Sequence, residues 1–175
     1  VILSPRGLSP VYNIDTIIES IPAVKQEFPG AIYILRRYNE DLRYQSEIER
    51  MILELDLAQS VRWIEKIEPW ERVAEIYNLA NIVLSVPSSD STSVSLLEAF
   101  ACGVPVIASD LPSIREWISD GENGLLVPAR DSTQLATATI QLLSHPQHCA
   151  RIAEKNLILI QEKADHQREM EKMEQ

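Results

Sequence analysis

The stretch that decides the fold covers residues 86–110 and reads "VPSSDSTSVSLLEAFACGVPVIASD". Its polar first part is typical of a loop, and the apolar residues that follow predict a short helix over residues 94–102. Gly103 then supplies a glycine cap, and Pro105 opposes continuation of the helix. The next residues, 105–108, predict a buried strand. A loop, a helix and a buried strand in succession are typical of a parallel α/β sheet.

The rest of the chain alternates between short β-rich runs and longer amphipathic stretches. The short runs, which we predict as strands, cover residues 1–4, 31–35, 60–64, 82–86, 105–108 and 124–127. The amphipathic stretches, which we predict as helices, cover residues 15–27, 41–55, 70–79, 94–102, 114–119, 132–144 and 147 onward. This alternation predicts an α/β fold: a Rossmann-like, doubly wound parallel sheet of about six strands flanked by helices.

The composition is that of one acidic globular domain. The 175 residues are 45% hydrophobic and carry a net charge of -10. This charge argues against a nucleic-acid partner, because backbone phosphates bind clustered Lys and Arg side chains. No stretch approaches the roughly 20 apolar residues that span a bilayer, and no signal-peptide pattern is present. Cys102 and Cys149 form neither a metal-ligand spacing nor a disulfide framework, so we expect reduced thiols and a cytoplasmic protein.

The segments that follow the predicted strands are candidates for a ligand site, because open parallel sheets bind ligands at the carboxyl ends of their strands. These segments read "SPRGLSPVYN" (4–13), "RRYNED" (36–41), "EKIEPW" (65–70), "PSSDSTSV" (87–94) and "SDLPS" (109–113). Several carry arginine, lysine or a dense cluster of hydroxyl groups. A helix N-terminus with one or two cations beside it can hold a phosphate or another anion.

The densest hydroxyl cluster lies at the start of the helix predicted over residues 94–102. Ser91, Thr92, Ser93 and Val94 would place their backbone N–H groups there. The unpaired amides and the dipole at a helix N-terminus favour phosphate. The sequence therefore indicates an anion site at this turn.

A second explanation of the same region needs no ligand. Ser95 and Glu98 form an S-x-x-E pattern, which is a capping box that would satisfy the first amides of the helix. The arginines at neighbouring strand ends favour the anion site instead. Arg6 follows the first strand, and Arg36 and Arg37 end the second.

Other common chemistries lack their motifs. His145, His148 and His166 lie near the C-terminus, away from the strand ends. The pair His145-x-x-His148 lacks the glutamate and the spacing of a zinc-protease helix. There is no G-x-S-x-G elbow, no P-loop and no G-x-G-x-x-G fingerprint. We therefore expect no metal site at the histidines and no glycine-rich nucleotide loop.

The chain resembles the C-terminal, donor-binding domain of retaining glycosyltransferases of the GT-B fold, family 4, also called group 1. The strongest segment is "DSTSVSLLEAFACGVPVIASDLPSIREWISDGENGLLVPARD", residues 90–131. It is similar to the family stretch "E-G-F-G-L-x-x-L-E-A-M-A-C-G-x-P-V-V-A-S" followed by "D-G-x-x-G-L-L-V". The resemblance extends from Val1 to about Ser144 and implies one half of a GT-B fold.

The resemblance also implies a role for each candidate residue. Glu98 would bond the ribose hydroxyls of a nucleotide, and Asp90 would contact the transferred sugar. The amides of residues 91–94 would hold the diphosphate, and Arg6 would neutralise the leaving phosphates. The two acids would then lie on either side of the anion rather than repel it.

The reaction implied by the resemblance is the retaining transfer of a hexosyl group from a UDP-, GDP- or ADP-sugar to a glycan or a lipid-linked acceptor. Catalysis would be mainly electrostatic, through stabilisation of the departing nucleoside diphosphate. The family fold uses no divalent metal, and the sequence has no Asp-x-Asp motif. We therefore expect neither a metal nor another cofactor.

The chain departs from the family pattern at the end of the second strand, where "RRYN" stands in place of a frequent Gly-Asp-Gly-Pro, and at two candidate site positions. The first acid is Asp90 rather than glutamate, so its side chain is shorter by one methylene. The lysine that usually follows the arginine is absent, and Tyr12 and Asn13 stand about there. Tyr12, Arg36 or Arg37 would have to replace that cation.

The expected domain organisation is that of part of a longer enzyme. Residues 1–145 are predicted to form the nucleotide-sugar-binding domain, and residues 146–175 a C-terminal helical extension that packs on a missing N-terminal domain. The start at Val1 rather than Met agrees with this interpretation. The missing domain would carry the acceptor site and any peripheral membrane contact, so we expect the chain alone to be inactive.

Two alternative functions remain open. A nucleotide-sugar 2-epimerase of the GT-B fold has a similarly organised C-terminal domain, although "EAFACGVPVIAS" favours a transferase. A non-catalytic sugar-nucleotide-binding module is suggested by the absent lysine and by the aspartate at position 90.

Overall fold

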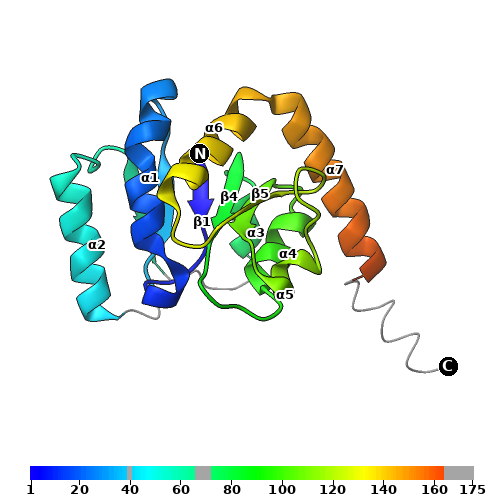
Figure 1. Cartoon of the computed structure of the whole chain (residues 1–175), viewed down its shortest axis with the longest axis horizontal. Coiled ribbons are helices and arrows are strands. Elements are labelled where there is room, and N and C mark those ends of the chain that lie inside the picture. The colour runs from blue at the N-terminus through cyan, green and yellow to red at the C-terminus, as the bar shows by residue number, and fades with distance from the viewer. Residues whose placement is uncertain (39–40, 66–71, 164–175) are drawn as a thin grey trace.

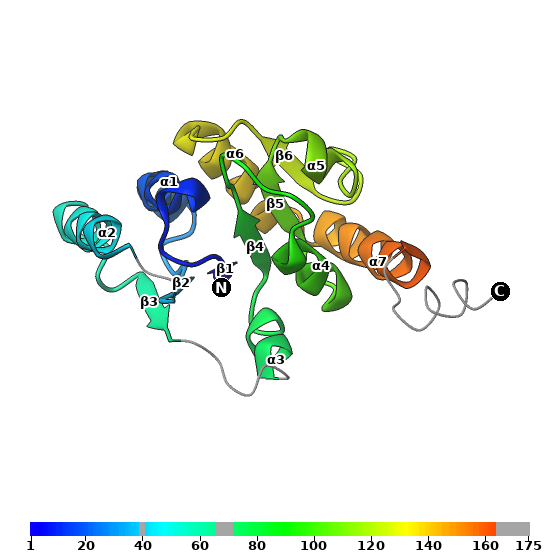
Figure 2. The same ribbon diagram turned by 90° about the horizontal axis from the view of Figure 1, so that it is seen from below.

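Six short runs of mainly apolar residues form one sheet in the computed structural model, which describes residues 1–38, 41–65 and 72–163. The strands are β1 (Ile2–Ser4), β2 (Tyr33–Arg36), β3 (Val61–Ile64), β4 (Ile82–Ser85), β5 (Val106–Ser109) and β6 (Leu125–Val127). All neighbouring pairs are parallel, and the order across the sheet is β3-β2-β1-β4-β5-β6. Figure 1 labels the central strands β1, β4 and β5, and Figure 2 labels all six. The predicted parallel α/β sheet is confirmed.

The connections between the strands are helical, as predicted. The helices are the 3-10 turn η1 (Pro10–Tyr12), α1 (Ile14–Glu27), α2 (Leu42–Glu54), α3 (Val73–Tyr77), α4 (Val94–Ala101), α5 (Pro112–Arg115), α6 (Ser132–Ser144) and α7 (Pro146–Lys163). The helix predicted over residues 114–119 is wrong in its bounds, because α5 starts two residues earlier at Pro112, whose ring suits the first turn of a helix. Residues 70 and 71 of the helix predicted over 70–79 lie outside the described residues.

The helices cover both faces of the sheet. On one face, α1, α2 and α6 pack over an apolar cluster that includes Ile17 and Ile21 of α1 (Figure 2). On the other face, α3, α4 and α7 share a cluster that includes Tyr77 and Phe100. Strands β4 and β5 are buried along their whole length, which fits continuous apolar runs rather than alternating ones.

Helix α7 packs on the described domain. Ile152 and Asn156 are fully buried, and Leu157 lies beside Gly103 at the end of α4. The side-chain amide of Asn123 donates to Asn156 Oδ1 at 3.0 Å. Residues 146–163 are thus tied to this sheet, residues 164–175 lie outside the described residues, and contact with a preceding domain stays a prediction.

The strand order reverses between β1 and β4, and this reversal places the candidate site. The chain proceeds outward from β1 to β2 and β3, and then returns to β4 on the other side of β1. Connections leave the neighbouring strands β1 and β4 in opposite directions at such a switch point, so a crevice forms at their carboxyl ends. The two loops meet there: Ser88 N donates to Val11 O at 2.8 Å, and Asn13 Nδ2 donates to Val86 O at 2.8 Å.

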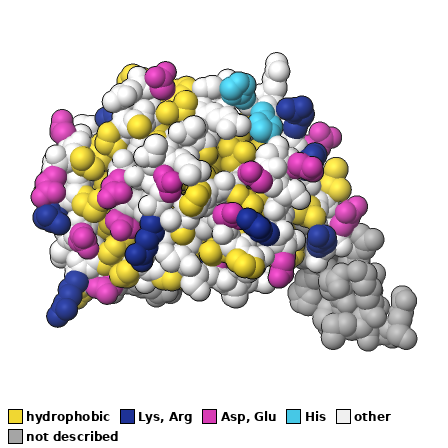
Figure 3. Space-filling view, viewed as in Figure 1, with side chains coloured by type: hydrophobic (Ala, Val, Ile, Leu, Met, Phe, Trp, Pro, Cys, Tyr) yellow, Lys and Arg dark blue, Asp and Glu magenta, His cyan; other side chains and the backbone are white. Residues whose placement is uncertain are grey.

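The surface of the domain is mixed in character. Figure 3 shows acidic and basic side chains interspersed over one face, with apolar side chains between them. Within the described ranges, no helix combines the length and the apolar character needed to cross a membrane.

Candidate functional site

Arg6 lies at the centre of the candidate site, in the loop that follows β1. Its Nη1 atom donates to Ser93 Oγ at 3.0 Å and to Ser95 Oγ at 3.1 Å. The same atom lies 3.1 Å from Asp90 Oδ2, and the two charged side chains are only 11% and 13% exposed. The structure therefore brings together Arg6 and the loop after β4, as expected for loops on either side of a switch point.

Two neighbouring features fix the position of Arg6. The ring of Tyr12, in η1, lies 4.1 Å from the guanidinium carbon, a distance at which a cation and an aromatic face attract. Gly7 follows Arg6, and a Cβ atom at this position would overlap the carbonyl oxygen of Tyr38. Glycine at position 7 thus allows the β1 loop to approach the end of β2 closely.

The start of α4 presents backbone amides beside Arg6. Ser93 is the N-cap residue, but its hydroxyl accepts from Arg6 and makes no capping bond. Ser91 N donates to Asp90 Oδ1 at 3.0 Å. The N–H groups of Thr92, Ser93 and Val94 have no hydrogen-bond partner in the part of the chain that the structure describes. These amides, at the positive end of the α4 dipole, are free to bind an anion.

The capping-box interpretation of Ser95 and Glu98 is wrong. Helix α4 begins at Val94, so Ser95 lies inside its first turn and not at the N-cap. The hydroxyl of Ser95 accepts from Arg6, and Glu98 Oε2 accepts from the hydroxyl of Tyr77 at 2.7 Å. Both side chains are therefore used in contacts between elements rather than in a local cap.

Tyr77 is a part of the site that sequence reasoning missed. It ends α3, is 1% exposed, and its hydroxyl oxygen also lies 3.2 Å from the Ser95 carbonyl oxygen. Burial, and then the negative charge of Glu98, hold the pKa of Tyr77 well above its ordinary value. The phenol thus stays protonated and donates to the Glu98 carboxylate.

Arg36 and Arg37, the other predicted cations, have different neighbours. Arg36 Nη1 donates to the carbonyl of Pro5 at 3.4 Å, next to Arg6 in sequence, and its guanidinium stacks on Tyr38. Arg37 instead pairs with Glu49 at 2.9 Å on α2 and stacks on Trp63 of β3. Of the two, only Arg36 lies beside the loop that carries Arg6.

Three further residues at this edge were not among the predicted site residues. Asn13 and Ser88 hydrogen-bond to each other, with Asn13 Nδ2 donating to Ser88 Oγ at 2.9 Å. Arg130, in the loop after β6, donates from Nε to both residues. Asn13 and Ser88 lie in the quoted segments 4–13 and 87–94, and Arg130 lies three residues after the last predicted strand.

The two described histidines bond to the backbone. His145 Nδ1 lies 2.7 Å from the Gln141 carbonyl oxygen, and His148 Nε2 lies 3.1 Å from that of Gly121. Both lie at the α6–α7 turn, away from the carboxyl ends of β1 and β4.

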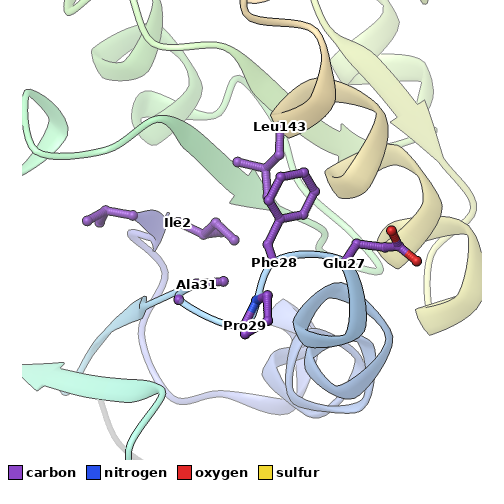
Figure 4. Close-up of a pocket in the computed structure, with 8 residues that line it drawn as sticks. Ile2, Glu27, Phe28, Pro29, Ala31 and Leu143 are labelled. Carbon is purple, nitrogen blue, oxygen red and sulfur yellow. The ribbon is translucent and has the colours of Figure 1, made fainter.

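An apolar cavity of about 360 Å³ lies at the amino ends of the strands, opposite the candidate site (Figure 4). It is lined by Ile2 at the start of β1, by Phe28 and Ala31 between α1 and β2, and by Leu143 near the end of α6. These residues surround the amino ends of the strands, so this cavity is separate from the cluster around Arg6.

Sequence comparison connects the chain with known proteins. The family described as "Glycosyl transferases group 1" matches residues 1–157. A D-inositol 3-phosphate glycosyltransferase of Corynebacterium urealyticum is 32% identical over 120 residues, which are 62% of this chain and 28% of the relative. A phosphatidyl-myo-inositol mannosyltransferase of Mycobacterium leprae is 31% identical over 141 residues, 77% of this chain and 34% of the relative. The chain thus spans about a third or less of the length of these relatives.

Comparison with solved structures supports the same fold. The C-terminal domain of the group 1 family glycosyl transferase LpcC from Francisella tularensis superposes with a TM-score of 0.85 and 23% identity, covering 94% of this chain and 86% of that one. HepE from Anabaena, in complex with UDP-glucose, superposes with a TM-score of 0.82 and 22% identity, covering 91% of this chain and 43% of that one.

Proposed function

This chain belongs to the glycosyl transferases group 1 family, and we propose that it is the part of a glycosyltransferase that binds the nucleoside-diphosphate sugar. The observation that carries the proposal is the position of Arg6 beside the amides of Thr92, Ser93 and Val94, which find no hydrogen-bond partner among the described residues. A cation and a helix N-terminus in one crevice are suited to a diphosphate. UDP is the first nucleotide to test, because the similarly folded HepE binds UDP-glucose.

Each residue has a distinct part in the proposed complex. The amides of residues 92–94 and the guanidinium of Arg6 hold the diphosphate, whereas the amide of Ser91, which the sequence also suggested, already donates to Asp90 Oδ1. Glu98, held by Tyr77, accepts hydrogen bonds from the ribose hydroxyls, and Asp90 contacts the sugar. Asp90 and Glu98 thus bind neutral hydroxyl groups, while positive groups between them meet the phosphates.

The proposed reaction is a retaining transfer of a hexosyl group to a glycan or a lipid-linked acceptor. The bond between the anomeric carbon and the phosphate oxygen breaks, and its electron pair stays on the diphosphate. The acceptor oxygen bonds to the anomeric carbon and loses its proton. Arg6 and the α4 amides stabilise the charge that develops on the leaving diphosphate, which is where such groups accelerate a reaction.

In this proposal the acceptor binds to a part of the enzyme outside this chain. We therefore expect the chain alone to bind the donor weakly and to transfer nothing. A 2-epimerase is disfavoured, since the relatives compared above are transferases. A non-catalytic binding module would bind the nucleotide equally well, so only turnover by the full-length protein separates it from an enzyme.

Calorimetric titration of the chain with UDP, GDP and ADP tests the proposal. We expect one of them to bind, and Glu98→Ala to lower its affinity by about tenfold through lost charge-assisted hydrogen bonds. Glu154→Ala, which removes an exposed carboxylate from α7, is the matched control and should change nothing. Addition of EDTA should leave the affinity unchanged, because the proposed complex neutralises the diphosphate with side chains and helix amides and not with a metal ion. The proposal is wrong if none of the three nucleotides binds.

A further inference from the structure

Arg130 has a backbone conformation that arginine rarely adopts. It lies in the loop between β6 and α6, with a φ of 62° in the left-handed region. A residue with a Cβ atom is disfavoured there, and such conformations persist where surrounding contacts impose them. The contacts of the Arg130 side chain are therefore informative.

The Arg130 side chain is anchored at the switch point of the sheet. Its Nε atom donates to Asn13 Oδ1 at 3.3 Å and to Ser88 Oγ at 3.2 Å. Asn13 is itself 1% exposed and donates to the Val86 carbonyl, so this anchor is rigid on the protein side. Arg130 thus reaches from the end of β6 to the loops that follow β1 and β4.

The same loops carry the proposed diphosphate site. Asn13 follows Tyr12, whose ring lies against the guanidinium of Arg6, and Ser88 precedes Asp90 by two residues. The anchor of Arg130 is therefore formed by the same two loops that carry the Arg6–Asp90 pair. Since the Nε atom is used for the anchor, the outer part of the guanidinium remains for another ligand.

The outer guanidinium nitrogens of Arg130 are unused within the described residues. No hydrogen bond from Nη1 or Nη2 and no ion pair involves Arg130 in residues 1–38, 41–65 and 72–163. The side chain is exposed. Arg130 therefore offers a fork of N–H donors of the kind that binds phosphate oxygens in a bidentate manner.

The charges at the site require a second cation. Asp90 lies 3.1 Å from Arg6 and offsets its positive charge, while a diphosphate carries more than one negative charge. Residues 92–94 contribute only the partial charges of their amides. Arg6 and the α4 amides alone would leave the bound diphosphate incompletely neutralised.

We propose that Arg130 is a donor-binding residue that contacts the diphosphate through its Nη1 and Nη2 groups. This inference rests on the proposed function, and it assigns the second cation to a loop that neither Tyr12, Arg36 nor Arg37 belongs to. Asn13 and Ser88 accept from Nε, and these two residues orient the guanidinium.

Titration of an Arg130→Asn variant tests the assignment, because asparagine tolerates the left-handed conformation and keeps the loop intact. The probes are the nucleoside diphosphate that binds the unaltered chain most tightly, its monophosphate and its nucleoside. We expect the variant to lose about tenfold in affinity for the diphosphate, less for the monophosphate and nothing for the nucleoside. Arg130→Lys should lose less, and Arg151→Asn on α7 is the exposed control.

The outcomes separate this inference from the proposed function. Equal diphosphate affinity in Arg130→Asn and the unaltered chain overturns the assignment and leaves the proposed function standing. An equal loss for the nucleoside also overturns it, because the residue would then act on the base or on the shape of the loop. An unaltered chain that binds no nucleoside diphosphate refutes both. Arg130→Gly, which relieves the backbone, should reproduce the loss with an unreduced melting temperature.

Discussion

Tyr77 and Glu98 are joined by a hydrogen bond of 2.7 Å between the end of α3 and the second turn of α4. Tyr77 is buried, and its hydroxyl uses only Oε2 of the carboxylate. Oε1 has no hydrogen-bond partner among residues 1–38, 41–65 and 72–163. A buried phenol thus orients an acid whose second oxygen can accept from a ligand hydroxyl, so Tyr77 is a positioning residue in the proposed complex.

Tyr77→Phe should weaken nucleotide binding through Glu98. Without the hydroxyl the carboxylate is free to rotate, so we expect about a threefold to tenfold loss of affinity for the nucleoside diphosphate. The free energy of unfolding should fall by about 1 kcal/mol, because a buried hydrogen bond is lost. Calorimetry and urea denaturation measure the two effects.

The double variant Tyr77→Phe with Glu98→Ala provides the control. If Tyr77 acts only through Glu98, its removal should cost no further affinity once the carboxylate is absent. Losses that simply add would show that Tyr77 contacts the nucleotide by another route.

Asp90→Asn should strengthen the binding of a nucleoside diphosphate that lacks the sugar. The change keeps the shape of the side chain and an oxygen for Ser91 N, but it removes the charge that offsets Arg6. We expect a gain of about threefold to tenfold in affinity, because a partly buried like charge next to an anion is removed. Titration of both proteins at low and moderate salt measures it.

Asp110→Asn is the control for this change, since Asp110 is another acid that follows a strand and pairs with an arginine, Arg115. Its pair is exposed, so the variant should leave the affinity unaltered. Weaker binding by Asp90→Asn would contradict the assignment of the diphosphate to the neighbourhood of Arg6.

Local patterns were sufficient for the elements of this fold and for part of the site. The predicted strands and helices have the right order because apolar runs, Gly103 and Pro105 act over a few residues. Arg6 and Asp90 could be placed at one edge, since both follow strands of a parallel sheet. Their ion pair needs β1 and β4 to be neighbours, and no local pattern specifies that order.

The errors at the site concern contacts between elements. The S-x-x-E pattern at Ser95 favours a local cap, but Arg6 and Tyr77 compete for the two side chains after the sheet and α3 have assembled. Arg130 lies 117 residues from Asn13 in sequence, so its role at the first loop depends on the complete sheet. Sequence separation of this size explains why these residues were missed.

Gly7→Ala should destabilise the domain and weaken nucleotide binding together. The added methyl group would meet the backbone carbonyl of Tyr38, so the loop that carries Arg6 must shift. We expect a loss of about 2 kcal/mol in the free energy of unfolding from this overpacking. Gly30→Ala is the matched control, because no atom lies within 4 Å of its new methyl group. If Gly7→Ala and Gly30→Ala had the same free energy of unfolding, the backbone at Gly7 would not lie close to the Tyr38 carbonyl.

Alkaline pH should unfold the domain through its buried tyrosines. Burial raises the pKa of Tyr33, Tyr44 and Tyr77 well above the ordinary value of 10.0. Above pH 10 the unfolded chain loses these protons while the folded chain keeps them, so the folded state binds more protons. The contribution of these tyrosines to the free energy of unfolding is therefore complete below pH 10, and it decreases as the pH rises further. Burial also raises the pKa of Cys102 and Cys149 above 9.0, which adds a decrease of the same sign from about pH 9.

Urea denaturation followed by circular dichroism between pH 7 and pH 12 measures this dependence. Once the unfolded chain is deprotonated, each protected tyrosine lowers the free energy of unfolding by about 1.4 kcal/mol per pH unit. Tyr77→Phe should reduce the total slope by about that amount, although it lowers the stability at neutral pH. A slope above pH 10 that is the same in Tyr77→Phe and in the unaltered chain would show that the Tyr77 phenol titrates in the folded protein as it does in water. The Tyr77 hydroxyl would then not be buried and bonded to the Glu98 carboxylate, and Tyr77 could not position Glu98.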